Sequence, residues 1–146
     1  MRFVVIVKPS MAGALYLDTS AVLRAVLETG TSPDVERRIH ASSALLTSRL
    51  SLVEASRAIH RLRHRGQTSE SKLADAEREI NELWARCELW ELTPEVCEMA
   101  RQVANGASLR ILDALHLATF VLARRRIAGL ELVTVDARLA NAVPAA

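Results

Sequence analysis

The chain has 146 residues, of which 50% are hydrophobic and 25% charged, a composition typical of one globular domain rather than a disordered or fibrous segment. Such a chain buries about 68–70% of the surface that its unfolded form exposes, so Cys87 and Cys97 are not needed as a disulfide and we expect reduced thiols in a cytoplasmic protein. A net charge of +2 permits a polyanionic partner without requiring one, while only 3% aromatic residues argues against a surface that stacks bases.

The chain begins with an apolar run at residues 3–7, which is too short for a signal-peptide core or a membrane span. No membrane or export role follows from it. We expect residues 1–13 to be a leader or an upstream-start extension, with Met11 as the alternative start, ahead of one domain over residues 14–146. An extra edge strand is the alternative interpretation of this run.

Short apolar runs of strand length alternate with helical patterns along the rest of the chain. The predicted strands are 14–17, 44–46, 89–92 and 130–133, and the predicted helices are 19–29, 33–41, 49–65, 69–86, 94–104, 109–126 and 136–142. Strands separated by helices cannot pair as hairpins. We therefore predict a single-domain α/β fold, with a mainly parallel sheet of four to five strands and helices on both faces.

Four acidic side chains stand where the strands and the following helices meet. Asp18 follows the first predicted strand, and Asp136 follows the last. Glu54 and Asp113 lie in otherwise apolar helical contexts, where an unpaired charge would be costly to bury. Because ligands of an open parallel sheet bind outside the carboxyl ends of its strands, we expect these acids to face one rim.

Each acid taken alone has a simpler structural explanation. Arg57 lies three positions after Glu54, and Arg110 lies three positions before Asp113, so each pair has the spacing of a helical ion pair. The other two acids suit a helix cap and a turn. Taken together the four are better explained as a cluster that needs a compensating cation. All-oxygen ligands suit Mg²⁺ or Mn²⁺, which could activate a water for phosphodiester hydrolysis.

The segments around the acids resemble the four acidic motifs of PIN-domain ribonucleases, in family order, and most closely those of VapC-like toxins from type II toxin–antitoxin systems. The resemblance spans residues 14–143. Its motifs are DTSAVL at 18–23, SLVE at 51–54, LDALHLA at 112–118 and TVDARL at 134–139. The residues before position 14 depart from the family pattern, in which the first strand begins almost at the initiator methionine.

This resemblance implies a Mg²⁺-dependent endoribonuclease, with Mn²⁺ as the alternative ion, that cleaves RNA with metal-activated water. The acids would hold the metal directly or through water, and hydroxyls beside them would orient a water or a phosphate. The implied metal ligands are Asp18, Glu54, Asp113 and Asp136, and the implied positioning hydroxyls are Thr19, Ser20 and Thr134. A cognate antitoxin protein would occlude the acidic groove, and a homodimer is the family expectation.

Basic residues and one histidine near the acids allow more than one interpretation. Arg57 and Arg61 lie on the helical face of Glu54, where they could bind phosphate at the edge of the site. The run 124–126 precedes a helix end and is better explained as a solvated terminus. His116 stands in an apolar helix, where a packed, hydrogen-bonded side chain is more probable than a general base.

Other functions remain open at this level. A PIN nuclease of RNA processing, or a non-catalytic PIN-like binding module, would carry the same motifs. An aspartate-nucleophile phosphatase would need a carboxylate at position 20, where Ser20 stands. A phosphoacceptor signalling domain would need a lysine after a late strand, and the only lysines are Lys8 and Lys72.

Overall fold

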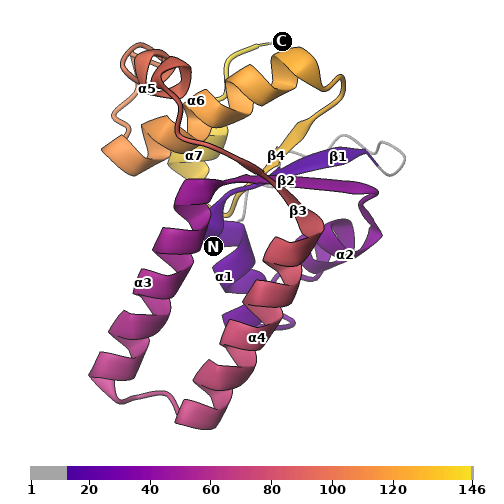
Figure 1. Ribbon diagram of the computed structural model, residues 1–146, viewed down its shortest axis with the longest axis vertical. Coiled ribbons are helices and arrows are strands. Elements are labelled where there is room, and N and C mark those ends of the chain that lie inside the picture. Colours follow the sequence, from indigo (N-terminus) through magenta and orange to yellow (C-terminus); the bar gives the residue numbers. More distant parts are fainter. Residues whose placement is uncertain (1–12, 146) are drawn as a thin grey trace.

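The structure is a computed structural model that describes residues 13–145, so the expectation of a leader over residues 1–13 lies almost wholly outside the described residues. It confirms the predicted α/β architecture (Figure 1). The described elements are β1 (Ala14–Leu17), α1 (Thr19–Leu27), α2 (Pro33–Ala41), β2 (Ala44–Ser48), α3 (Arg49–Arg65), α4 (Glu70–Arg86), β3 (Cys87–Trp90), α5 (Pro94–Ala100), α6 (Ile111–Arg126), β4 (Glu131–Val133) and α7 (Ala137–Asn141).

The described strands form one parallel sheet in the order β3-β2-β1-β4. Parallel neighbours need crossover connections, and helices supply them between every pair of consecutive strands. This order places β1 and β2 in the centre, and their carboxyl ends lie at the same rim as the end of β4. The residues that follow these strands are therefore brought together at that rim.

Both faces of the sheet are covered, because successive residues of a strand point to opposite sides. Leu15 and Leu17 of β1 pack in one apolar cluster with residues of α1 to α4, whereas Tyr16 packs in a second cluster with α6 and α7. Figure 1 shows α1, α3 and α4 on one side of the sheet and α6 on the other. The expectation of helices on both faces is confirmed.

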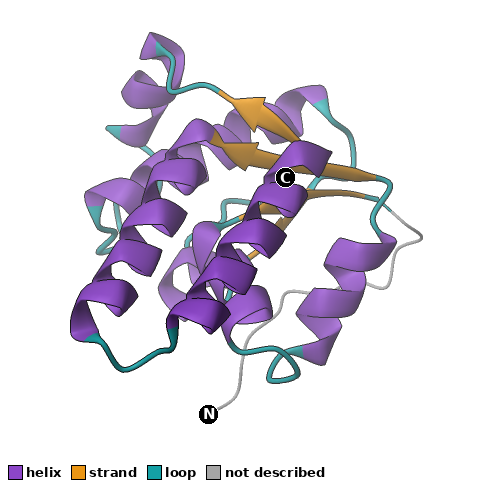
Figure 2. Ribbon diagram, turned by 60° about the horizontal axis from the view of Figure 1, so that its bottom comes forward, coloured by secondary structure: helices purple, strands orange, loops and turns teal. Residues whose placement is uncertain are grey.

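The helices α3 and α4, 17 residues each, pack against each other as an antiparallel hairpin (Figure 2). Their apolar stripes meet in the first cluster, through Ala55 and Ile59 of α3 and Ala76 and Ile80 of α4. Arg63 of α3 adds ion pairs to two glutamates of α4. Since α3 carries Glu54, packing of this hairpin holds in place the helix on which that acid lies.

Several predicted boundaries were wrong by two residues or more: α1 ends at Leu27 rather than 29, β2 extends to Ser48 rather than 46, and α6 begins at Ile111 rather than 109. The third strand was expected at 89–92 but begins at Cys87, because α4 runs directly into β3 without a loop. The helix expected at 94–104 ends at Ala100, and turns follow it through a backbone with positive φ at Ala104. Across the described part of the chain, no helix is long and apolar enough to cross a membrane.

Candidate active site

Asp18 is the most deeply buried of the four acids. It follows β1 directly, and its backbone N–H donates to the carbonyl oxygen of Val133 at 3.0 Å, which ties the ends of β1 and β4 together. Its side chain is 7% exposed. One oxygen, Oδ2, accepts hydrogen bonds from Ser20 Oγ at 2.5 Å and Thr134 Oγ1 at 2.7 Å. Two of the three predicted positioning hydroxyls therefore orient Asp18 itself.

Burial raises the pKa of Asp18, because an ionised carboxylate loses its hydration there. The charge of His116 and the hydrogen bonds from Ser20 and Thr134 act in the opposite direction but do not outweigh burial. The free oxygen, Oδ1, has the Nε2 atom of His116 at 3.8 Å. A buried carboxylate in this state is stabilised by any cation that reaches Oδ1.

Glu54 lies on α3, and its Oε1 atom has two close partners. Thr19 Oγ1 donates to it at 2.8 Å, and His116 Nε2 lies 2.5 Å away. Burial alone would raise the pKa of Glu54, but the hydrogen bond and charge of His116 outweigh burial and lower it. The structure thus pairs Glu54 with Thr19 and His116 rather than with Arg57, which is exposed on the same helix.

His116 is packed and hydrogen-bonded, as the sequence analysis favoured. It is 1% exposed, with Nδ1 2.9 Å from Tyr16 Oη and Nε2 facing Glu54 and Asp18. Burial alone would lower its pKa, but the hydrogen bond to Glu54 and the charge of Asp18 outweigh burial and raise it. The two carboxylates therefore favour the protonated imidazole, and both ring nitrogens have partners.

Asp113 and Asp136 face a second cation, Arg110. The Nε atom of Arg110 lies 3.2 Å from Asp113 Oδ2, and its Nη2 atom lies 3.7 Å from Asp136 Oδ2. The simpler explanation of Asp113 as an ion-pair partner of Arg110 is confirmed. Asp136 also caps α7, with Oδ1 accepting from the backbone N–H of Arg138 at 2.8 Å.

His116 and Arg110 connect all four acids into one electrostatic unit. The charge of Arg110 lowers the pKa of Glu54, and the charge of Asp113 raises that of His116. The acids come from four separated segments, yet two neighbouring positive groups contact or influence each of them. The structure thus joins the acids in two pairs, Asp18 with Glu54 through His116 and Asp113 with Asp136 through Arg110. Convergence of all four on one ion stays a prediction.

A groove of about 630 Å³ opens beside this unit. Its cations are Arg61 and Arg110, and two residues of its wall, Ile111 and Leu112, expose 80% and 44% of their surface. Its full lining is Glu54, Arg61, Leu109, Arg110, Ile111, Leu112 and Asp113. A long anionic chain laid in this groove would meet both positive charges next to two of the acids.

The donor chemistry fits a hard divalent cation, because all four candidate ligands are carboxylates and hydroxyls lie beside them. As arranged here, however, no three carboxylate, imidazole or thiol groups within residues 13–145 lie close enough to hold one ion. The acids are instead neutralised by His116 and Arg110. A metal would therefore compete with these internal cations for the same oxygens.

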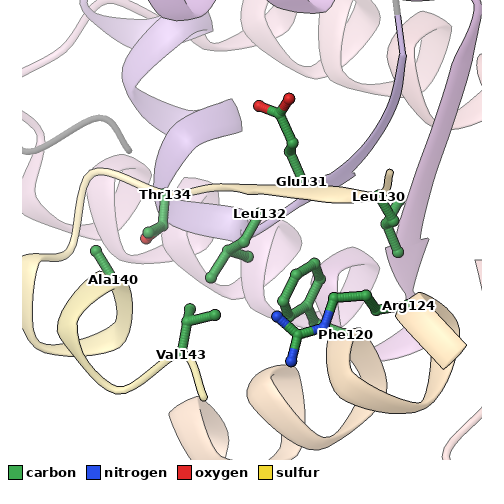
Figure 3. A pocket seen from close by; sticks show the side chains of 8 residues that line it. All are labelled: Phe120, Arg124, Leu130, Glu131, Leu132, Thr134, Ala140 and Val143. Atoms are coloured by element: carbon green, nitrogen blue, oxygen red, sulfur yellow. The ribbon is translucent and has the colours of Figure 1, made fainter. Parts of the chain in front are cut away.

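A second cavity, of about 210 Å³, lies between α6, β4 and α7 (Figure 3). Leu130 and Leu132 point into it, while Glu131 points away, toward an ion pair with Arg38 (Figure 3). Most of its lining is apolar: Phe120, Arg124, Leu130, Glu131, Leu132, Thr134, Ala140 and Val143. Glu131 is the single acid in this lining, whereas the groove at the rim contains Glu54 and Asp113.

Sequence reasoning did not assign Tyr16, His116 or Arg110 to the site. Signals for them were present. Tyr16 lies on β1 two positions before Asp18, which follows this strand with an extended backbone, and His116 lies one helical turn after Asp113. The bond between Tyr16 and His116 had no such signal, because it joins two elements far apart in the chain.

Comparison with known proteins relates this chain to ribonucleases. The family model described as PIN domain matches residues 15–143. Ribonuclease VapC45 and Ribonuclease VapC49, from two strains of Mycobacterium tuberculosis, are each 35% identical over 106 residues, which cover 72% of this chain and 73% of theirs.

Solved structures agree on the fold. The crystal structure of Mycobacterium tuberculosis VapC20, described as a sarcin-ricin loop cleaving toxin, matches with a TM-score of 0.62 at 15% identity and covers 88% of this chain and 94% of that one. A toxin–antitoxin complex from Klebsiella pneumoniae matches with a TM-score of 0.56 at 20% identity, covering 84% and 86%.

Proposed function

The chain belongs to the PIN-domain family and, within it, to the VapC-type ribonucleases, and from this premise we propose that it hydrolyses RNA phosphodiesters as the toxin of a toxin–antitoxin pair. The observation that carries the proposal is a groove that places two of the acids, Glu54 and Asp113, beside two arginines. The other two acids are joined to them through shared cations, Asp18 through His116 and Asp136 through Arg110. Carboxylates suit a divalent cation, and arginines suit the phosphates of the substrate.

The proposed metal ligands are Asp18, Glu54, Asp113 and Asp136, with Mg²⁺ as the ion and Mn²⁺ as a substitute. When bound, such an ion lowers the pKa of a ligand water and stabilises developing charge on phosphodiester oxygens. Ser20 and Thr134 hold Oδ2 of Asp18, which leaves Oδ1 free to face the ion. Thr19 and His116 hold Oε1 of Glu54 in the same way.

Hydroxyls and arginines complete the proposed site. Thr19, Ser20 and Thr134 act on the substrate through the acids that they orient, since each bonds to a carboxylate. Arg61 lines the groove, and Arg57, exposed on the same helix, would contact phosphate further along the RNA. The backbone of the RNA is the part that this chain can hold, because the groove presents no stacked aromatic platform.

A cognate antitoxin is the proposed protein partner. One of the similar solved structures is a toxin–antitoxin complex, which supports this assignment. A segment of such a partner could cover the groove by placing apolar side chains on Ile111 and Leu112 and an acidic group beside Arg110. We also propose that the chain forms a homodimer, as the resemblance implies.

The direct test incubates the purified chain with structured RNAs in Mg²⁺, with and without EDTA. We expect cleavage that EDTA abolishes and that excess Mg²⁺ or Mn²⁺ restores. Cleavage that persists in EDTA would refute the metal assignment. Metal-independent RNA binding without any cleavage would instead favour the non-catalytic binding module.

The toxin assignment has its own test. Induced expression of the chain in a bacterial host should arrest growth, and co-expression of the adjacent small open reading frame should relieve the arrest. An active nuclease that leaves growth unaffected would favour a PIN nuclease of RNA processing.

A further inference from the structure

Arg110 occupies the N-cap position of α6 and bridges two acids that belong to different elements. Its Nε atom contacts Asp113 in the first turn of α6, and its Nη2 atom contacts Asp136 at the start of α7. The two carboxylates are mostly buried, with side-chain exposures of 16% and 23%, whereas the arginine side chain is 70% exposed. The guanidinium therefore lies over the acids from the groove side.

This placement puts an internal cation where the proposed metal ligands converge. A guanidinium and a divalent ion satisfy the same carboxylate oxygens, so they are alternatives for Asp113 and Asp136. With Arg110 in this position, no three ligands within the described residues are poised around one ion. An ion bound to Oδ2 of Asp113 and Oδ2 of Asp136 would take the position that Arg110 now holds.

We propose that Arg110 is the counter-ion of Asp113 and Asp136 in the metal-free protein, and that it becomes a ligand for a substrate phosphate once a divalent cation takes these carboxylates. This inference rests on the proposed function. The exchange is energetically accessible, because the charge of an arginine that is 70% exposed is screened by water and its long side chain can swing into solvent.

The groove supplies a destination for the displaced guanidinium. Arg110 and Arg61 both line it, so a released Arg110 adds a second positive charge beside Glu54 where a phosphate would lie. Binding of the metal to the acids would thus free the guanidinium of Arg110 to bind a substrate phosphate. The expected signature is a pair of opposite effects when Arg110 is replaced.

The first measurement is Mn²⁺ binding by isothermal titration calorimetry in the absence of RNA. Arg110→Gln removes the competing cation, and we expect it to bind Mn²⁺ about three- to fivefold more tightly than the unaltered chain. Arg61→Gln is the matched control. It removes the same charge from the same groove, but at an arginine that is not paired with Asp113 or Asp136. We expect this control to change the affinity less than about twofold.

The second measurement is the KM for cleavage of a short single-stranded RNA at saturating Mn²⁺. Loss of a charge-assisted contact to phosphate should raise the KM of Arg110→Gln about tenfold, although this variant holds its metal more tightly. Equal unfolding temperatures of the variant and the unaltered chain would show that the fold is intact.

The outcomes separate the two claims. If the unaltered chain binds no Mn²⁺, both the proposed function and the role of Arg110 are overturned. If it binds Mn²⁺ and Arg110→Gln binds equally or more weakly, the exchange is overturned while the nuclease assignment stands. Tighter metal binding with an unchanged KM overturns the phosphate contact.

Discussion

Tyr16 and His116 stand 100 positions apart in the chain, yet the phenolic oxygen of one lies 2.9 Å from Nδ1 of the other in the buried interior. This bond fixes the imidazole ring so that its opposite nitrogen faces Glu54 and Asp18. A buried tyrosine of β1 thereby fixes the histidine that contacts two acids at the rim. Such an outer partner commonly fixes a histidine in sites of this kind.

Replacing Tyr16 by phenylalanine should destabilise the protein, although the ring and its edge contact with Phe120 are retained. The substitution leaves Nδ1 of His116 buried without a partner, which costs about 1–3 kcal/mol. The unfolding temperature of the metal-free protein should fall by about 3–9 °C, as measured by circular dichroism. An unchanged temperature would show that the bond contributes nothing net.

Replacing Glu54 by glutamine should lower the pKa of His116. The hydrogen bond to Glu54 is the largest influence that raises this pKa, and burial opposes it. Without the carboxylate of Glu54, less opposes the lowering of the His116 pKa by burial, and the neutral imidazole is favoured. Titration of the His116 ring resonances by NMR in EDTA measures the change. Glu88→Gln, an exposed position on β3, is the control and should leave the His116 titration where it is.

The stability of the metal-free protein should decline as the pH rises above about 6.5. His116 has a folded-state pKa above its ordinary value of 6.5, so its stabilisation is complete below pH 6.5 and is lost as the pH rises through the folded pKa. Asp18 also makes stability decline with rising pH, but the decline begins at lower pH. Its folded-state pKa lies above 3.8, so its contribution is complete below pH 3.8 and is lost as the pH rises through the folded pKa.

Glu54 acts in the opposite direction but in a separate range. Its folded-state pKa lies below 4.5, so its contribution is lost only as the pH falls through that lower value. Thermal unfolding in EDTA across a pH series tests the decline, and the Glu54→Gln variant should show a weaker one above neutrality. A stability that rises through this range would contradict the charge state assigned to His116.

Replacing Asp18 by asparagine should abolish cleavage while making the metal-free protein more stable. We expect cleavage in Mg²⁺ to fall by about 100-fold or more, as when a key electrostatic group is removed from an active site. The unfolding temperature in EDTA should rise by about 2–5 °C, because a buried charge is removed while Ser20 and Thr134 keep an acceptor. Asp113→Asn is the control for stability, since that acid already has Arg110 beside it.

Unchanged cleavage by Asp18→Asn would remove this residue from the metal site, and an equal or lower unfolding temperature would argue against a costly buried charge.

Much of the fold was predictable from the sequence because its signals are local. Strand lengths, capping residues such as Thr93 before Pro94, and apolar stripes in α3 and α4 each depend on neighbours within one or two turns. The position of Asp18 after a buried strand, and of Asp136 after another, followed from the same patterns. The boundary of β3 did not, because nothing local marks where α4 becomes a strand without a loop.

The sequence by itself determined which acids this protein has, which elements carry them, and that a parallel sheet would bring them to one rim. Only the tertiary structure decided that Glu54 pairs with His116 rather than Arg57, and that Arg110 reaches Asp136 as well as Asp113. Spacing along one helix limits which residues are neighbours on that helix. It carries no information about side chains that approach from other elements, and these distances of a few ångströms depend on how the whole core packs.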